Sequence, residues 1–134
     1  MRTAGEDVIS VSFEVPRIPV TINRLSREHW SKRVLHRKTW MLEIRAALGT
    51  GRKYQELRAW AECGDKVRVE VHVIHTKEFD PDNLYSAAKI PMDAMKGIGC
   101  LADDTNKHVE LVVTQAIGKE KVTQFRITRM EGGK

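Results

Sequence analysis

The stretch Val67-Arg68-Val69-Glu70-Val71-His72-Val73 alternates between valine and polar or charged residues. Successive side chains of a β-strand point to opposite faces of a sheet, so this alternation predicts a strand with one buried face. His75 continues the valine face just past the expected end of the strand. The chain is therefore expected to contain a sheet, and the segments on either side indicate what pairs with this strand and covers it.

Three other segments have the pattern of strands. Residues Val8–Val15 alternate in the same way, and the prolines at positions 16 and 19 end regular pairing after them. His108–Ile117 and Lys121–Thr128 are two further strands, and the short Gly118-Lys119 connection predicts that they pair as a hairpin. We therefore expect a mixed sheet of about four strands.

A long helix is expected between the first two strands. Ser26 is a suitable N-cap, and Gly49-Thr50-Gly51 breaks the helix near Leu48. Arg37 falls on the apolar face of this helix, where it would extend to the edge or meet a buried partner. The residues that share this face at helical spacing, and that we expect in the core, are Trp30, Val34, Met41, Ile44 and Leu48.

A second main helix follows Asp80-Pro81, a favoured helix start, and Pro91 should kink it or split it in two. A shorter helix over Tyr54–Ala61 also fits the pattern. The order of the main elements is β-α-β-α-β-β. It predicts an α/β (α+β) fold, with residues 1–134 forming a single compact domain.

Size and composition narrow the class of protein. The chain has 134 residues, of which 41% are hydrophobic and 31% charged, as expected for one globular domain. No apolar run is long enough to span a bilayer, and the amino terminus lacks the apolar core of a secretory signal. Cys63 and Cys100 are isolated, which favours reduced thiols in a cytoplasmic protein.

Positive charge is concentrated in one segment. Residues 24–53 contain nine basic and two acidic residues and so carry +7, against +5 for the whole chain. A basic region of this density suits a polyanion such as nucleic acid, although a solvated helix surface would explain it equally well. The candidate DNA-binding residues in and beside this segment are Asn23, Arg24, Arg27, Lys32, Arg33, Arg37 and Lys38.

The stretch Phe79-Asp80-Pro81-Asp82-Asn83-Leu84 places two aspartates where a strand has ended and a helix begins. Their carboxylates can converge on one hard cation, and Mg²⁺ prefers such oxygen ligands. The pair Asp103-Asp104 is the obvious source of a third carboxylate. The alternative is that Asp80 caps the helix and Asp82 interacts favourably with the helix dipole. An EF-hand is excluded, because its glycine and its terminal glutamate are missing.

The combination of these segments resembles the RusA family of Holliday-junction resolvases. The matching pieces follow one another in order over nearly the whole chain. They are Pro19-Val20-Thr21-Ile22-Asn23, Asp80-Pro81-Asp82-Asn83-Leu84, Lys89, Asp93-Ala94-Met95 and Asp103-Asp104.

The resemblance implies an enzyme, a metal-dependent endodeoxyribonuclease that resolves Holliday junctions or other branched DNA by phosphodiester hydrolysis. Asp80, Asp82 and Asp104 would be the catalytic, metal-binding carboxylates, with Mg²⁺ or alternatively Mn²⁺ as the cofactor. Lys89 would be the catalytic lysine, because it stands four residues before Asp93. The resemblance also implies a homodimer that acts on four-way junctions, and the short apolar runs noted above predict no membrane partner.

Two alternatives stay open at the level of sequence. One is a junction- or nucleic-acid-binding module without catalysis, which would keep the basic segment but make no productive use of a divalent ion. The other is a metal-dependent nuclease with a different substrate, such as flaps or RNA, because phosphate contacts do not encode the shape of a substrate. His75 lies close enough to Asp80 to be considered as a ligand or a base, whereas His72 is expected to face solvent or a neighbouring element. We assign neither residue a catalytic role.

Overall fold

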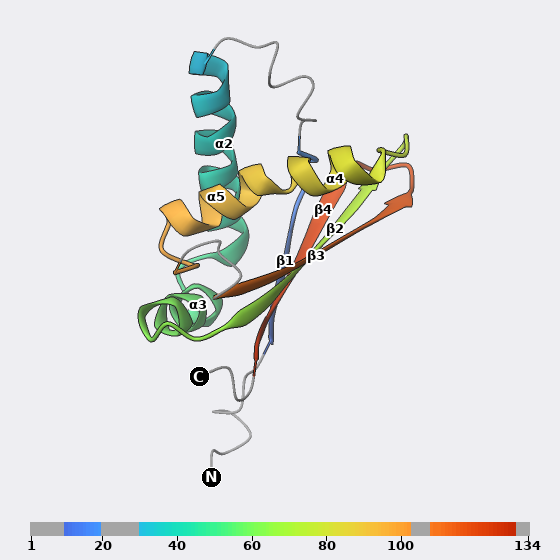
Figure 1. Ribbon diagram of the computed structural model, residues 1–134. Helices are drawn as coiled ribbons and strands as arrows, with labels where there is room; N and C mark the ends of the chain where they lie inside the picture. The colour runs from blue at the N-terminus through green and yellow to red at the C-terminus, as the bar shows by residue number, and fades with distance from the viewer. Residues whose placement is uncertain (1–9, 20–29, 103–107, 131–134) are drawn as a thin grey trace.

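The computed structural model describes residues 10–19, 30–102 and 108–130. These residues form four strands and four helices (Figure 1). In chain order, the elements are β1 (Ser10–Val15), α2 (Trp30–Leu48), α3 (Arg52–Glu62), β2 (Val67–His75), α4 (Pro81–Ala87), α5 (Lys89–Gly97), β3 (Val109–Ile117) and β4 (Val122–Arg129). The α+β class and the mixed four-stranded sheet are thereby confirmed.

The strands form one sheet in the order β1-β4-β2-β3. β4 pairs antiparallel with both β1 and β2, whereas β2 and β3 run parallel. The valines of β2 are at most 5% exposed, so the alternation that predicted this strand also put it inside the sheet, with a partner on each side. Parallel pairing means that β2 and β3 end at the same edge of the sheet, which fixes where the segments after them lie.

The predicted hairpin between the last two strands is wrong, because β2 lies between β3 and β4. The connection after β3 crosses the end of β2, where the Gly118 amide donates to the His75 carbonyl at 2.9 Å. A Cβ at Gly118 would lie 2.7 Å from Cγ2 of Ile74, so glycine permits this close crossing. The span over one strand is about 9.6 Å, which a connection of four residues can bridge. A turn signal fixes a change of direction, but burial of β2 on both sides decides the partners.

The helices cover one face of the sheet, called here the covered face, and the core lies between the two layers. Phe13 of β1 stacks on Phe125 of β4 with ring centroids 4.8 Å apart, and Trp40 of α2 meets Phe125 edge-on at 6.2 Å. The opposite face, called the open face, carries exposed polar residues such as Ser12 and Gln124. The described buried apolar residues form one core cluster.

The predicted apolar face of α2 is only partly correct. Ile44 and Leu48 are buried, but Val34 is 40% exposed, and Trp40, which was not predicted, is 2% exposed. The reason is visible in Figure 1, where the amino-terminal half of α2 extends beyond the sheet and has no core to face. The side chain of Trp30 and the predicted cap at Ser26 lie outside what the structure describes.

The predicted interruption at Pro91 is confirmed. Proline lacks the amide that would bond to the carbonyl of Ala87, and α4 ends at that residue while α5 begins at Lys89. Ala88 between them keeps a right-handed helical backbone with φ −64° and ψ −16°. The two helices therefore follow one another nearly end to end across the molecule (Figure 1), and α5 packs against α2.

Candidate functional site

The covered face of the sheet turns polar at one edge. The rows centred on Val69 and Val71 are apolar, but Val73 is flanked by Gln115 on β3 and Thr123 on β4. The next covered position of β2 is His75, which is 2% exposed. Thr123 is fully buried and donates from Oγ1 to the Arg17 carbonyl at 2.6 Å. Buried polar groups need partners, and here those partners belong to the loops that surround the carboxyl end of β2.

The loop between β2 and α4 is tied down by two of these residues. The Phe79 amide donates to Gln115 Oε1, and Gln115 Nε2 donates to the Phe79 carbonyl, both at 2.9 Å. The ring of Phe79 packs on the His75 imidazole with centroids 4.2 Å apart. The backbone immediately before Asp80 is therefore fixed by the sheet. Sequence reasoning missed Gln115, although it interrupts the apolar series of Val109, Leu111 and Val113.

Asp80 and Asp82 begin the next helix with their carboxylates exposed. The Leu84 amide donates to the Asp80 carbonyl at 2.8 Å, but the Asp80 side chain makes no capping hydrogen bond. Neither carboxylate has an ion-pair or hydrogen-bond partner among the described residues. Asp80 is therefore the N-cap residue of α4, as the sequence predicted, but its side chain does not cap the helix, and among the described residues both carboxylates are exposed without a partner.

Lys89 is exposed at the start of α5 and is not paired with Asp93, its neighbour one turn further on. Asp93 instead accepts a hydrogen bond from Nε of Arg37 at 2.5 Å. The ammonium of Lys89 lies 5.3 Å from the centroid of the Tyr85 ring, one turn before it, within the range of a cation–π contact. Lys89 follows Asp82 by seven residues, or about 10 Å of helix rise. Its charge thus lies on α5, directly after the helix that starts at the aspartates.

Asp104 lies outside the described residues, but its described neighbours can be placed. The carbonyl of His108 accepts from the Val67 amide at 2.9 Å, so His108 lies at the amino end of β2. Asp80 follows the carboxyl end of that strand, about 26 Å away at the usual rise of a strand. Within the described ranges, no group of three or more His, Cys, Asp or Glu side chains is placed to hold a metal. Of the three predicted metal ligands, the described residues include Asp80 and Asp82, both at the start of α4.

The candidate DNA-binding residues are described in part. Asn23, Arg24 and Arg27 lie outside the described residues, as does the side chain of Arg33. Lys32 and Lys38 are exposed on α2. Arg37, the residue expected either to reach the helix edge or to find a partner, has its partner in Asp93. Of the described part of this group, Lys32 and Lys38 therefore provide the cations that a phosphate could reach without breaking an ion pair.

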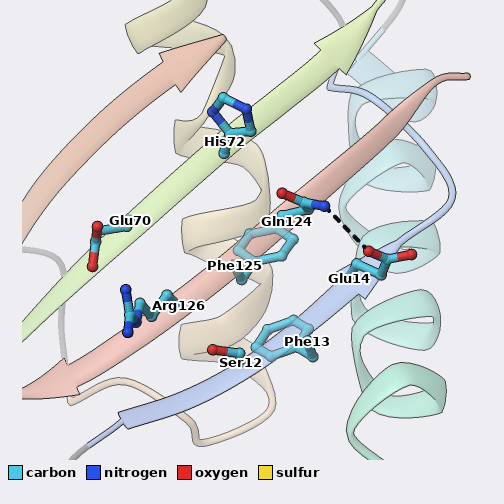
Figure 2. Close-up of a pocket in the computed structure, with 8 residues that line it drawn as sticks. All are labelled: Ser12, Phe13, Glu14, Glu70, His72, Gln124, Phe125 and Arg126. Atoms are coloured by element: carbon cyan, nitrogen blue, oxygen red, sulfur yellow. Dashed lines mark hydrogen bonds between the residues drawn. The ribbon is translucent and has the colours of Figure 1, made fainter. Parts of the chain in front are cut away.

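A hollow on the open face offers a different chemistry (Figure 2). Its polar side chains come from three strands, and Gln124 Nε2 donates to Glu14 at 3.4 Å. His72, which also lines it, is bonded through Nδ1 to Thr114 Oγ1 at 2.6 Å. Glu14, Glu70 and Arg126 line this hollow, so it carries both negative and positive charge. His72 thus faces away from the layer that carries Asp80 and Asp82, whereas His75 lies beneath their loop.

None of the described helices has the length and apolar character needed to cross a membrane. A scan against models of protein families finds no match to this chain, and a search of curated proteins finds no similar sequence.

Proposed function

We propose that this chain is a Mg²⁺-dependent endodeoxyribonuclease that resolves Holliday junctions or other branched DNA. The observation that carries the proposal is the pair of exposed carboxylates at Asp80 and Asp82, which have no partner among the described residues. They follow Phe79, whose backbone is bonded to Gln115 of the sheet. Two carboxylates suit a Mg²⁺ ion, which keeps several waters and shares its remaining positions with substrate phosphates. The sequence resemblance to RusA-type resolvases points to the same residues.

The residues divide the chemistry between them. When bound, the Mg²⁺ ion would activate a water molecule and polarise the phosphate. Asp80 and Asp82 would hold it. The resemblance implies Asp104 as a third ligand, but His108, four residues after it, lies at the opposite end of β2, so the two aspartates of the helix start carry the proposal. The ammonium of Lys89 would stabilise negative charge that develops on the phosphate oxygens. Lys32 and Lys38 on α2 would contact the DNA backbone and so hold the substrate without selecting its sequence.

Cleavage of a four-way junction by the purified full chain tests the proposal. We expect cleavage with Mg²⁺ or Mn²⁺, none in EDTA, and little cleavage of a matched linear duplex. Junction binding without cleavage under every metal condition would identify a binding module instead. Equal cleavage of flaps, RNA or linear duplex would identify a nuclease of different substrate preference.

Asp82→Asn tests the assignment of the site. This substitution removes one ligand charge without touching α2, so we expect cleavage to be lost while junction affinity changes by less than about threefold. Glu78→Gln is the matched control, because Glu78 is an exposed acid of the same loop. Near-normal turnover in Asp82→Asn, or equal effects of the two substitutions in a gel-based cleavage assay, would exclude Asp82 as a ligand.

A further inference from the structure

Phe79 is held at three points by residues of the sheet. Its amide and its carbonyl are both bonded to the side-chain amide of Gln115, each at 2.9 Å. Its ring packs on the buried imidazole of His75. The same imidazole accepts at Nδ1 from the amide of Lys77 at 3.4 Å, so a second backbone group of the loop is tied to it. A loop residue with both backbone groups bonded to one side chain has little freedom left.

Asp80 lies between this anchor and a second one. On its other side, the Asp80 carbonyl accepts the first hydrogen bond of α4, from Leu84 at 2.8 Å. The backbone of Asp80 is therefore fixed from both directions, while its carboxylate is engaged by neither anchor. An arrangement in which the backbone is bound and the charged group is left free suits a ligand residue, because less conformational entropy is lost when an ion binds.

Only an amide side chain can hold Phe79 in this way. Gln115 offers one donor and one acceptor side by side, which match the carbonyl and amide of a single residue. Glutamate in its place would offer acceptors only and would repel the Phe79 carbonyl. Gln115 also belongs to the covered face of β3, where a polar side chain has to find a partner. Its position is explained by the loop that it holds.

We propose that Gln115 is a positioning residue that preorganises Asp80 and Asp82 for a divalent cation. The inference rests on the proposed function, because it takes these carboxylates as the metal ligands. Gln115 touches neither the ion nor the DNA and acts through the backbone of Phe79. Its loss lets the loop move, so that the carboxylates have to be ordered when the ion binds, and the affinity for metal falls. Partners that orient metal ligands contribute about 10- to 100-fold in metal affinity.

Gln115→Met and Gln115→Glu test this role, with Gln124→Met as the matched control on the open face. Mn²⁺ binding to the full chain, followed by electron paramagnetic resonance, gives the metal affinity without reference to activity. We expect the Mn²⁺ dissociation constant to rise about tenfold or more in both Gln115 variants and to stay unchanged in Gln124→Met. The cleavage rate of the variants should return towards that of the wild type at saturating metal.

Hydrogen exchange at the Phe79 amide separates positioning from general stability. We expect its protection to fall in both Gln115 variants while the amides of β2 remain protected. Unchanged Mn²⁺ affinity together with lost Phe79 protection would overturn the inference, because the clamp would then be structural only. Wild-type protein that binds Mn²⁺ but cuts no DNA would defeat the proposed nuclease and still support positioning by Gln115. Wild-type protein that binds no Mn²⁺ would overturn both.

Discussion

Individual polar residues at the carboxyl end of β2 fall into two groups. The side chain of Gln115 is hydrogen-bonded to the backbone of Phe79, and the side chain of Thr123 is hydrogen-bonded to the backbone of Arg17. Asp80 and Asp82 have carboxylates without a hydrogen-bond or ion-pair partner in the part of the chain that the structure describes. A buried polar group that bonds to backbone stabilises one loop conformation, whereas an exposed carboxylate without a partner adds little to stability. The first group therefore suits positioning, and the second suits binding.

The role of Lys89 can be tested against Lys96, an exposed lysine of the same helix one heptad further from the aspartates. We expect Lys89→Ala to lower the single-turnover cleavage rate by about 100-fold or more, since one preorganised charge contributes on that scale. Junction affinity and the Mg²⁺ midpoint should change little. Lys96→Ala should leave the rate near that of the wild type. Equal and mild effects of the two substitutions in a quench-flow experiment would show that Lys89 is an ordinary exposed lysine without a catalytic role.

The two cysteines should differ sharply in reactivity. Cys63 is exposed, whereas burial raises the pKa of the Cys100 thiol to about 12 despite the nearby guanidinium groups of Arg45 and Arg58. A thiol with a raised pKa stays protonated, and therefore unreactive, at every pH below that value. We expect a disulfide reagent at pH 8 to modify one thiol per folded chain and two per unfolded chain. Rapid modification of both thiols under native conditions would contradict the buried position of Cys100.

At the scale of elements, the sequence predicted what depends on local pattern. The alternation of Val67–Val73 identified β2, and Pro91 identified the break between α4 and α5. The strand pairing after Gly118 could not be predicted, because it depends on which strand is buried on both sides and not on the turn itself. The exposure of Val34 was missed for a similar reason, since periodicity defines a face of α2 but not how far the sheet extends beneath it.

The candidate site shows the same division. The local pattern was sufficient to place Asp80 and Asp82 at the start of a helix after a strand, and their role as metal ligands stays a prediction. The contact between Gln115 and Phe79 joins residues 36 positions apart, and it depends on the parallel register of β2 and β3. The ion pair of Arg37 likewise depends on the packing of α2 against α5. For neither contact does the local sequence indicate which residue is the partner.

Arg37 and Lys38, adjacent on α2, should respond differently to alanine substitution. Lys38 is exposed and forms no ion pair with any described residue, so we expect Lys38→Ala to reduce the slope of log affinity against log salt by about one. Arg37→Ala removes the partner of Asp93, so we expect a loss of about 1 kcal/mol or less in the free energy of unfolding, since the pair is partly exposed. Fluorescence titration across a salt series and urea unfolding measure the two effects. An Arg37→Ala variant with unchanged stability but a reduced salt slope would show that Arg37 contacts DNA instead.

At the scale of the whole molecule, the candidate site lies at one edge of the sheet, while the amino-terminal half of α2 extends past the other layers (Figure 1). α2 carries the exposed lysines at positions 32 and 38, and α5 joins it to the helix that begins at the aspartates. A single copy of this domain offers one such site. Cutting both strands of a junction symmetrically needs two sites related by a two-fold axis.

We therefore expect the protein to be a homodimer, and α2 carries the features of an interface. Leu35 and Leu42 are 61% and 73% exposed, and they are seven residues apart, so they lie on one stripe of the helix. Leu35 lies on the projecting amino-terminal half of α2 and Leu42 on the half that follows, and both would be buried if a second copy of the helix packed against them. Val112 on β3, 37% exposed, is an apolar residue away from this stripe.

Light scattering on the wild type and on two variants tests this arrangement. We expect a dimer for the wild type and for the control Val112→Lys, and a monomer for the double variant Leu35→Lys, Leu42→Lys, because two buried charges facing their symmetry mates cannot be accommodated. The monomer should retain its fold and its Mg²⁺ affinity, since α2 packs on α5 through a different side, around Met41 and Gly97. It should nick junctions without producing paired cuts. A wild-type protein that stays monomeric even with a junction bound would contradict the dimer, and a double variant that remains dimeric would move the interface away from α2.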